Sequence, residues 1–268
     1  MTNAFTFKAL LQNDGWKPNC TIQVDDKGMI SKIETNSDNQ GEIIDGFAIP
    51  GFQNAHSHAF QYAMAGMAEQ HENAADSDDF WGWRESMYQL ALTITPEDLY
   101  KIGVDLYSEM LRNGYTSVAE FHYVHHQPDG TPYPNVSEMG EALLRASRDT
   151  GIKITLVPIF YQKGGFGKAP NDRERRFIST TVEYYNDLLE ATLKCSTKYP
   201  LANVGIGIHS MRGVEPTDII RVANEFSQDL PFHIHVSEQL KEIEDSVAYL
   251  GKRPVEWLLD NIQMTDRF

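Results

Sequence analysis

Residues 50–58 read PGFQNAHSH, a strand-like stretch that ends in two histidines separated by one serine. Alternate side chains of a strand point to the same face. We therefore expect His56 and His58 to lie together at the carboxyl end of a strand. Two imidazoles on one face are a suitable pair of metal ligands, although such a pair on its own also occurs as an ordinary surface feature.

Strand patterns and helix patterns alternate from residue 50 onward. A helix is predicted to begin at Thr95, which is followed by a proline and two acidic residues, and to end at Gly114. Apolar strands between helices favour a parallel sheet and an α/β fold. The further strands are predicted at residues 116–121, 152–160, 204–208 and 232–236, and the further helices at 137–151, at 179–196, from Pro216 and from Pro254.

The predicted units divide the chain into two regions. Residues 51–268 supply about five strand–helix units, whereas a closed eight-unit barrel needs about 250 residues for the barrel alone. These units therefore predict either an open sheet or the first part of a longer barrel. Residues 1–50 contain short strand patterns with a hairpin signal at 26–28, and we expect them to form part of a small β-structure.

The composition narrows the classes of function. The formal net charge of −15 over 268 residues argues against binding to nucleic acid and to anionic membranes. Cys20 and Cys195 provide no disulfide framework and fit a reducing compartment. The N-terminus lacks a signal-peptide pattern, and no apolar run approaches the length of about 18 residues that a membrane span requires. We therefore expect a cytoplasmic location.

The last predicted strand carries a second pair of histidines. His233 and His235 share one face of residues 232–236, and Glu238 follows where the strand ends. The carboxyl ends of parallel strands carry the active site in α/β folds. A histidine there would complete a set of three metal ligands, and a neighbouring carboxylate would move protons for an activated water. The alternative is that Glu238 only caps the next helix.

Two more strands end in histidines. His209 and Arg212 follow residues 204–208, where an arginine would bind a carboxylate of the substrate. The segment after 116–121 contains His122, His125 and His126, which we expect to be surface residues outside the metal site, because a set of three histidines already suffices for catalytic zinc. No predicted strand ends in a lysine that would bridge two ions, so we expect a single metal ion.

Several stretches together resemble the formimidoylglutamate deiminase family of the amidohydrolase superfamily. The resemblance runs over nearly the whole chain. In the deaminase branch of this superfamily, an H-x-H motif on the first strand occurs together with an H-x-x-E motif on the fifth. The stretches that carry it are residues 50–61, 64–66, 80–85, 121–126, 164–167, 209–212 and 253–258, which include HAFQ, FWGWRE, FHYVHH and HSMR.

The resemblance implies a zinc enzyme that hydrolyses N-formimino-L-glutamate to N-formyl-L-glutamate and ammonia in histidine breakdown. It implies one zinc ion, or another divalent metal, and a TIM-type (β/α)8 barrel beside a small β-sandwich, formed in part by residues 1–50. The metal ligands would be His56, His58 and His235, the proton shuttle Glu238, and the substrate-binding residues Gln61, Arg84, Tyr123, His209 and Arg212, with His209 also assisting catalysis.

The resemblance also implies features beyond residue 268. Family members have a histidine on the sixth strand and a metal-binding aspartate on the eighth, so the chain is expected to be an N-terminal fragment that is inactive alone. The full-length parent is expected to form a homodimer and to bind a small dicarboxylate amidine. Two alternatives remain open: a related deaminase that acts on a purine or another ring, as guanine deaminase does, or a truncated remnant without catalytic activity.

One loop is predicted to close over the site. Residues 164–168 contain three glycines, and residues 171–176 carry a cluster of charges. Both follow the third predicted strand, at the edge of the sheet where lids are commonly found. We therefore expect these residues to form a mobile lid.

Overall fold

The computed structural model describes residues 3–36, 41–66 and 79–268. Contacts divide the chain into two compact units, Met1–Phe52 and Gln53–Phe268. No helix in the described ranges is both long enough and apolar enough to cross a membrane. Each unit is described separately below.

The first unit is a four-stranded sheet with the order β3-β2-β1-β4. Its strands are β1 (Asn3–Gln12), β2 (Gly15–Val24), β3 (Ile30–Thr35) and β4 (Glu42–Ala48). The predicted hairpin joins β2 and β3, where the Asp25 carboxylate accepts hydrogen bonds from the amides of Lys27 and Met29 and Gly28 adopts a φ of 78°. Strand β4 returns to pair with β1 in parallel.

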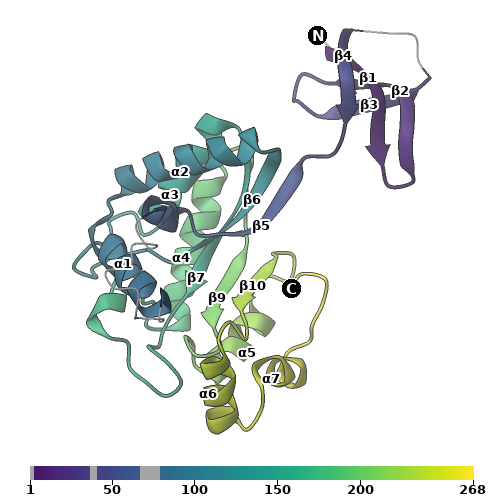
Figure 1. Cartoon of the computed structure of the whole chain (residues 1–268). Coiled ribbons are helices and arrows are strands. Elements are labelled where there is room, and N and C mark those ends of the chain that lie inside the picture. Colours follow the sequence, from purple (N-terminus) through teal and green to yellow (C-terminus); the bar gives the residue numbers. More distant parts are fainter. Residues whose placement is uncertain (1–2, 37–40, 67–78) are drawn as a thin grey trace. The chain divides into compact units, whose positions relative to one another are not determined.

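The second unit is built on a parallel sheet with the strand order β10-β9-β7-β6-β5, and Figure 1 shows β6, β7, β9 and β10 lying side by side. A short strand, β8, pairs with the first half of β7, and β9 pairs with its second half. The predicted parallel α/β arrangement is confirmed. The strands are β5 (Phe52–Ser57), β6 (Tyr115–His122), β7 (Lys153–Phe160), β8 (Ala202–Val204), β9 (Ile206–Ser210) and β10 (Phe232–His235).

Helices connect the strands in sequence order. Two helices, α1 and α6, were not predicted from the sequence, whereas the other five match predicted helices. The helices are α1 (Asp79–Thr93), α2 (Pro96–Arg112), α3 (Glu138–Thr150), α4 (Val182–Ser196), α5 (Pro216–Glu225), α6 (Leu240–Leu250) and α7 (Pro254–Asn261), and two short 3-10 helices are η1 (Ala59–Met64) and η2 (Asp172–Glu174).

Side chains on the two faces of β7 pack against different parts of the second unit. Phe160 stacks on Tyr185 of α4, so one face of β7 packs against the outer helices. Alternation places Ile159 on the opposite face, where it meets Gly207 of β9. A Cβ atom on Gly207 would lie 2.2 Å from Ile159 Cδ1 and 2.7 Å from Val157 Cγ1, so a larger residue would displace both side chains. Glycine at this position therefore leaves room for the side chains of β7 on this face of the sheet.

Candidate metal centre

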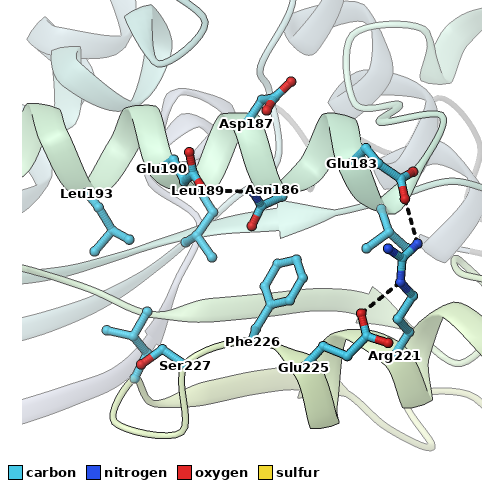
Figure 2. A pocket seen from close by; sticks show the side chains of 12 residues that line it. Glu183, Asn186, Asp187, Leu189, Glu190, Leu193, Arg221, Glu225, Phe226 and Ser227 are labelled. Atoms are coloured by element: carbon cyan, nitrogen blue, oxygen red, sulfur yellow. Dashed lines mark hydrogen bonds and ion pairs between the residues drawn. The ribbon is translucent and has the colours of Figure 1, made fainter.

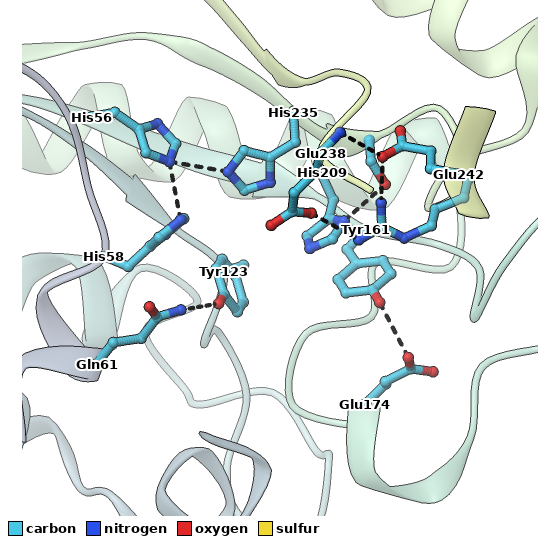
Figure 3. Close-up of polar contacts among 12 residues, drawn as sticks. His56, His58, Gln61, Tyr123, Tyr161, Glu174, His209, His235, Glu238 and Glu242 are labelled. Atoms are coloured by element: carbon cyan, nitrogen blue, oxygen red, sulfur yellow. Dashed lines mark hydrogen bonds and ion pairs between the residues drawn. The ribbon is translucent and has the colours of Figure 1, made fainter. Parts of the chain in front are cut away.

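Three histidines from β5, the following turn and β10 converge at the carboxyl edge of the sheet. His56 Nε2 lies 3.0 Å from both His58 Nε2 and His235 Nε2, as Figure 3 shows. Nitrogens that share a zinc ion at about 2.0–2.1 Å lie roughly 3.3 Å apart in a tetrahedral site. Among the described residues, these three are the group of histidine, cysteine and acidic side chains whose ligand atoms are close enough together to hold a metal ion.

The backbone of β6 fixes the orientation of one of these rings. His58 Nδ1 lies 2.9 Å from the carbonyl oxygen of Phe121, so the nitrogen donates its proton there and Nε2 carries the lone pair. The Phe121 ring stacks on His235, with centroids 4.2 Å apart and an interplanar angle of 26°. Phe121 therefore orients two of the three rings, one through its carbonyl group and one through its side chain.

Burial keeps the three imidazoles neutral. The pKa of His58 is lowered to about 4, chiefly by burial, and that of His235 is lowered to about 3 by burial together with the neighbouring imidazoles and Arg212. Burial also lowers the pKa of His56, although the Glu238 carboxylate opposes this effect. Neutral imidazoles are the form that binds metal ions. Three converging Nε2 atoms, one with its tautomer fixed, fit a divalent ion such as zinc.

His209 lies beside the three histidines. Its ring stacks on Tyr161 with centroids 4.0 Å apart, and it packs edge-on against His235 at 5.5 Å. The register between β9 and β10 shifts here, because Ile234 pairs with Ile208 and His235 pairs with Ser210. His209 is thus the extra residue of a bulge, a feature that often directs a side chain into a site.

Tyr123 and Gln61 also border the centre, and the Tyr123 ring packs edge-on against His209 with centroids 5.7 Å apart. The Tyr123 ring packs edge-on against His58, with centroids 5.3 Å apart, and its hydroxyl accepts a hydrogen bond of 2.8 Å from Gln61 Nε2. Burial raises the pKa of Tyr123, so the hydroxyl stays protonated and is able to donate a hydrogen bond. The structure therefore brings Gln61, Tyr123 and His209 to the same edge of the sheet as the three histidines.

Glu238 and Arg212 form an ion pair at this edge. Arg212 Nη2 lies 3.2 Å from Glu238 Oε2, and Arg212 Nη1 lies 2.9 Å from Glu242 Oε2. Arg212 also lowers the pKa of His235, after burial and the two neighbouring histidines. Arg212 therefore lies within electrostatic reach of the histidine cluster, but in this structure its guanidinium is occupied by two carboxylates.

The backbone between His235 and Glu238 is unusual. Ser237 adopts a φ of 59°, a left-handed conformation that costs a non-glycine residue energy and that is concentrated at functional sites. The amide of Glu238 then donates to Glu242 Oε2 at 3.1 Å. This turn directs the Glu238 side chain toward Arg212, and Figure 3 shows Glu238 between His235 and Glu242.

Four residues of the centre were not predicted from the sequence. Phe121 acts through its carbonyl group and its ring, and Tyr161 acts through its ring, so both resemble ordinary core residues in the sequence. Glu120 is fully buried and accepts hydrogen bonds from the amide of Ala59 and the hydroxyl of Tyr107. Of these four residues, only Glu242 could have been suspected from the sequence, because it lies four residues after Glu238.

The histidines at the end of β6 and in the following segment, His122, His125 and His126, are buried, which contradicts the expectation that they are surface residues. His125 Nε2 contacts the carbonyl oxygen of Ile159, and His126 Nδ1 contacts that of Arg176. His122 is 3% exposed, and burial lowers its pKa to about 3. These residues belong to the packed layer between the strand ends and the loops. The structure does not group them with the three converging histidines.

The predicted mobile lid is wrong for its second half. Glu174 and Arg176 are fully buried. Glu174 accepts hydrogen bonds from the hydroxyls of Tyr88 and Tyr161, and Arg176 donates to the carbonyl oxygens of Ala91, Ile94 and His126. A segment anchored by two buried charged groups is part of the wall of the site. Arg84 is placed in α1, but its side chain lies outside the described residues.

A separate groove lies between α4 and α5, as Figure 2 shows. Its volume is about 560 Å³, and Leu189 and Phe226 contribute apolar surface to it. Arg221 bridges Glu183 and Glu225 across its end. None of the predicted site residues lines this groove, so the candidate centre is the edge of the sheet.

Known proteins resemble this chain in sequence and in fold. A formimidoylglutamate deiminase from Pseudomonas aeruginosa is 41% identical over 270 residues, which cover 100% of this chain and 58% of that protein. The crystal structure of an amidohydrolase from Brucella melitensis is 43% identical and matches with a TM-score of 0.92 over 99% of this chain and 58% of that one. An adenosine deaminase from Xanthomonas campestris with bound zinc shares the fold, with a TM-score of 0.70 at 18% identity over 96% of this chain and 54% of that one.

The comparisons confirm the predicted resemblance and the fold class. This chain spans 58% of the two most similar of these proteins, and its curled parallel sheet is consistent with part of a TIM-type barrel. Residues 47–265, which include the histidine cluster and Glu238, match the Amidohydrolase family along their whole length. The chain therefore belongs to the Amidohydrolase family.

Proposed function

We propose that the full-length protein is a zinc-dependent deiminase that hydrolyses N-formimino-L-glutamate to N-formyl-L-glutamate and ammonia. The observation that carries the proposal is the convergence of three Nε2 atoms beside a carboxylate and an arginine. The 41% identity to a formimidoylglutamate deiminase supports the choice of substrate.

His56, His58 and His235 would hold the ion. A bound zinc ion supplies a Lewis acid that activates water at neutral pH. Glu238 accepts a proton from the attacking water as the C–O bond forms and passes it to the formimino nitrogen. The remaining hydroxyl proton follows to the same nitrogen as its bond to carbon breaks, so that ammonia leaves and the formyl C=O group remains. His209, held against Tyr161 and edge-on to Tyr123, orients the formimino group and supports the proton transfer.

The substrate carries two carboxylates, which need cationic partners in a chain with a net charge of −15. Arg212 is the cation placed beside Glu238, and a guanidinium binds a carboxylate through two parallel hydrogen bonds. Gln61 and Tyr123, which also border the centre, would donate hydrogen bonds to the substrate. We assign Arg84 to the second carboxylate on the basis of the sequence resemblance alone.

The direct test of activity is ammonia release from N-formimino-L-glutamate by the zinc-loaded full-length protein, with guanine and adenosine as competing substrates. Release from N-formimino-L-glutamate alone supports the proposal. Release from a purine would replace it with a ring deaminase, and no release from any of the three would leave the chain without this function.

The metal assignment has its own test. His58→Ala removes one ligand and is expected to weaken zinc affinity by more than about 100-fold, because loss of an outer partner of a ligand already costs 10–100-fold. His233→Asn is the matched control, since His233 lies on the same strand as His235 but outside the cluster. Competition with a chromophoric chelator measures both. Equal zinc affinity in the His58→Ala variant and the unmodified protein would contradict the assignment.

A further inference from the structure

Arg212 contacts two carboxylates that lie in very different surroundings. The Glu242 side chain is 1% exposed, and its Oε2 atom lies 2.9 Å from Arg212 Nη1. The Glu238 side chain is 42% exposed, and its Oε2 atom lies 3.2 Å from Arg212 Nη2. A shielded ion pair is stronger than one that water and salt reach. The Nη1 contact is therefore the firm one, and the Nη2 contact is weak.

Glu242 also holds the backbone that carries Glu238. The amide of Glu238 donates to the same Oε2 atom that binds Arg212. The left-handed Ser237 precedes this amide, so the turn is fixed at the level of the main chain. The Glu238 carboxylate itself is held, among the contacts of the described residues, by Arg212 Nη2. Its backbone is thus immobilised, while its side chain depends on an exchangeable contact.

We propose that Glu242 is a positioning residue that anchors Arg212 through Nη1, and that Nη2 is exchanged between Glu238 and a carboxylate of the incoming substrate. This inference rests on the proposed function, because it requires an anionic substrate at Arg212. Binding of the substrate carboxylate releases the Glu238 side chain toward the histidine cluster. The group that moves the proton is therefore held by an ion pair until a substrate of the correct charge arrives.

The exchange makes a specific prediction about ligand affinity, which is measured by calorimetry on the zinc-loaded full-length protein with N-formyl-L-glutamate. Glu238→Gln removes the carboxylate that competes for Nη2. Binding should tighten about two- to fivefold, the range that a partly exposed ion pair allows. The same substitution in an Arg212→Met background should leave the affinity unchanged, because the shared cation is absent.

This cycle separates exchange from simple charge repulsion. If Glu238→Gln tightens binding equally with and without Arg212, the carboxylate only repels the anionic ligand, and the exchange is wrong. If Glu238→Gln does not change the affinity in either background, the exchange is also wrong, although the proposed function stands. If the unmodified protein does not bind N-formyl-L-glutamate, the proposed function and this inference both fail.

The anchoring role of Glu242 is tested in the same assay. Glu242→Gln keeps the shape but removes the charge that holds Nη1, and the affinity should fall about tenfold or more. Glu244→Gln is the control, because it removes the same charge from an exposed position on α6. Zinc content and near-ultraviolet circular dichroism report whether each variant is folded. A folded Glu242→Gln variant with unchanged affinity would overturn the anchoring role.

Discussion

Glu120 is a buried carboxylate next to the loop that carries the histidine pair. It binds the amide of Ala59, directly after His58, and the hydroxyl of Tyr107 on α2. Burial raises the pKa of Glu120 from 4.5 to about 7, although hydrogen bonds from Ala59, Ser57 and Tyr107 oppose the shift. Glu120 joins β6, α2 and the segment after β5, and its protonation is linked to folding.

The sign of this linkage follows from the two pKa values. Below about pH 4.5 the carboxyl is protonated in both states, and its contribution to stability is fully present. Between about 4.5 and 7 the unfolded chain loses its proton first, so the free energy of unfolding falls, by at most about 1.4 kcal/mol per pH unit. Above about pH 7 no further loss occurs.

Glu120→Gln should therefore lack this pH dependence. We expect the free energy of unfolding of the unmodified protein, relative to the variant, to decrease between pH 5 and pH 7.5. Urea titrations at pH 5, 6 and 7.5, with a chelator present, measure the difference in the free energy of unfolding between the two proteins. The histidines are the same in both proteins, so their titration does not contribute to this difference. Parallel stability curves for the two proteins would contradict the raised pKa.

The sequence indicated the residues whose chemistry is distinctive and missed those that act through position. His56, His58 and His235 were found because strand alternation and the shared carboxyl edge of parallel strands follow from local patterns. Phe121 acts through a carbonyl group that every residue possesses, so no side-chain pattern distinguishes it. The contact of Arg212 with Glu242 depends on the turn at Ser237, and the left-handed backbone there has no glycine to mark it.

At the scale of elements, α2 begins in the structure where its capping residues predict a helix start. The Thr95 hydroxyl accepts a hydrogen bond from the Asp98 amide, and the Asp98 carboxylate accepts one from the Thr95 amide. Pro96 occupies the first turn, where its missing N–H group costs nothing. Together these residues define the start of the helix from sequence alone.

Thr95→Ala removes the side-chain acceptor of this capping box. We expect the free energy of unfolding to fall by about 1 kcal/mol, within a range of about 0.5–2 kcal/mol. Thr93→Ala is the matched control, because the Thr93 hydroxyl donates only to carbonyl groups within the last turn of α1 and should change stability by no more than about 0.5 kcal/mol. Urea denaturation of both variants provides the comparison. Equal losses would show that the cap adds nothing to stability.

The helices that the sequence did not predict lack such signals. Helix α1 begins among aromatic residues and contains Gly82, both of which have low helix propensity. Helix α6 has Gln239 at its N-cap, with no side-chain capping hydrogen bond. Its position is determined instead by Glu242, which accepts hydrogen bonds from the preceding turn and from Arg212. Tertiary contacts therefore determine where these helices lie, because their local helix propensity and capping do not.

At the scale of the second unit, Arg176 connects distant segments. Its guanidinium donates to the carbonyl oxygens of Ala91 and Ile94 at the end of α1 and to that of His126 after β6. Burial lowers its pKa, yet carbonyl groups from three positions satisfy the guanidinium. The residue lies in the loop after β7, so one side chain joins three successive connections.

Arg176→Met should leave these buried carbonyl groups without their donors. Each unsatisfied group costs about 1–3 kcal/mol, so we expect a loss of roughly 3 kcal/mol or more in the free energy of unfolding. Arg173→Met, at an exposed position three residues earlier, should change it by no more than about 0.5 kcal/mol. Thermal and urea unfolding measure both. A loss for Arg176→Met as small as that for Arg173→Met would show that water replaces the guanidinium.

The parallel sheet and the common edge of the site were predictable from the alternation of strands and helices. The burial of residues 171–176 was not, because a cluster of charges is usually solvated and here two of the charges are enclosed. Apart from the nearby Tyr161, the partners described above are carbonyl and hydroxyl groups that lie 50 to 86 residues away along the chain.

The contact between Gly207 and Ile159 restricts how this architecture can diversify. Two residues before His209, a Cβ atom would lie 2.2 Å from Ile159 Cδ1 and 2.7 Å from Val157 Cγ1. Any residue larger than glycine here therefore has to displace two neighbours in the layer beneath the histidines. Substitutions that alter specificity without disturbing this layer are expected in the connections at the rim of the sheet.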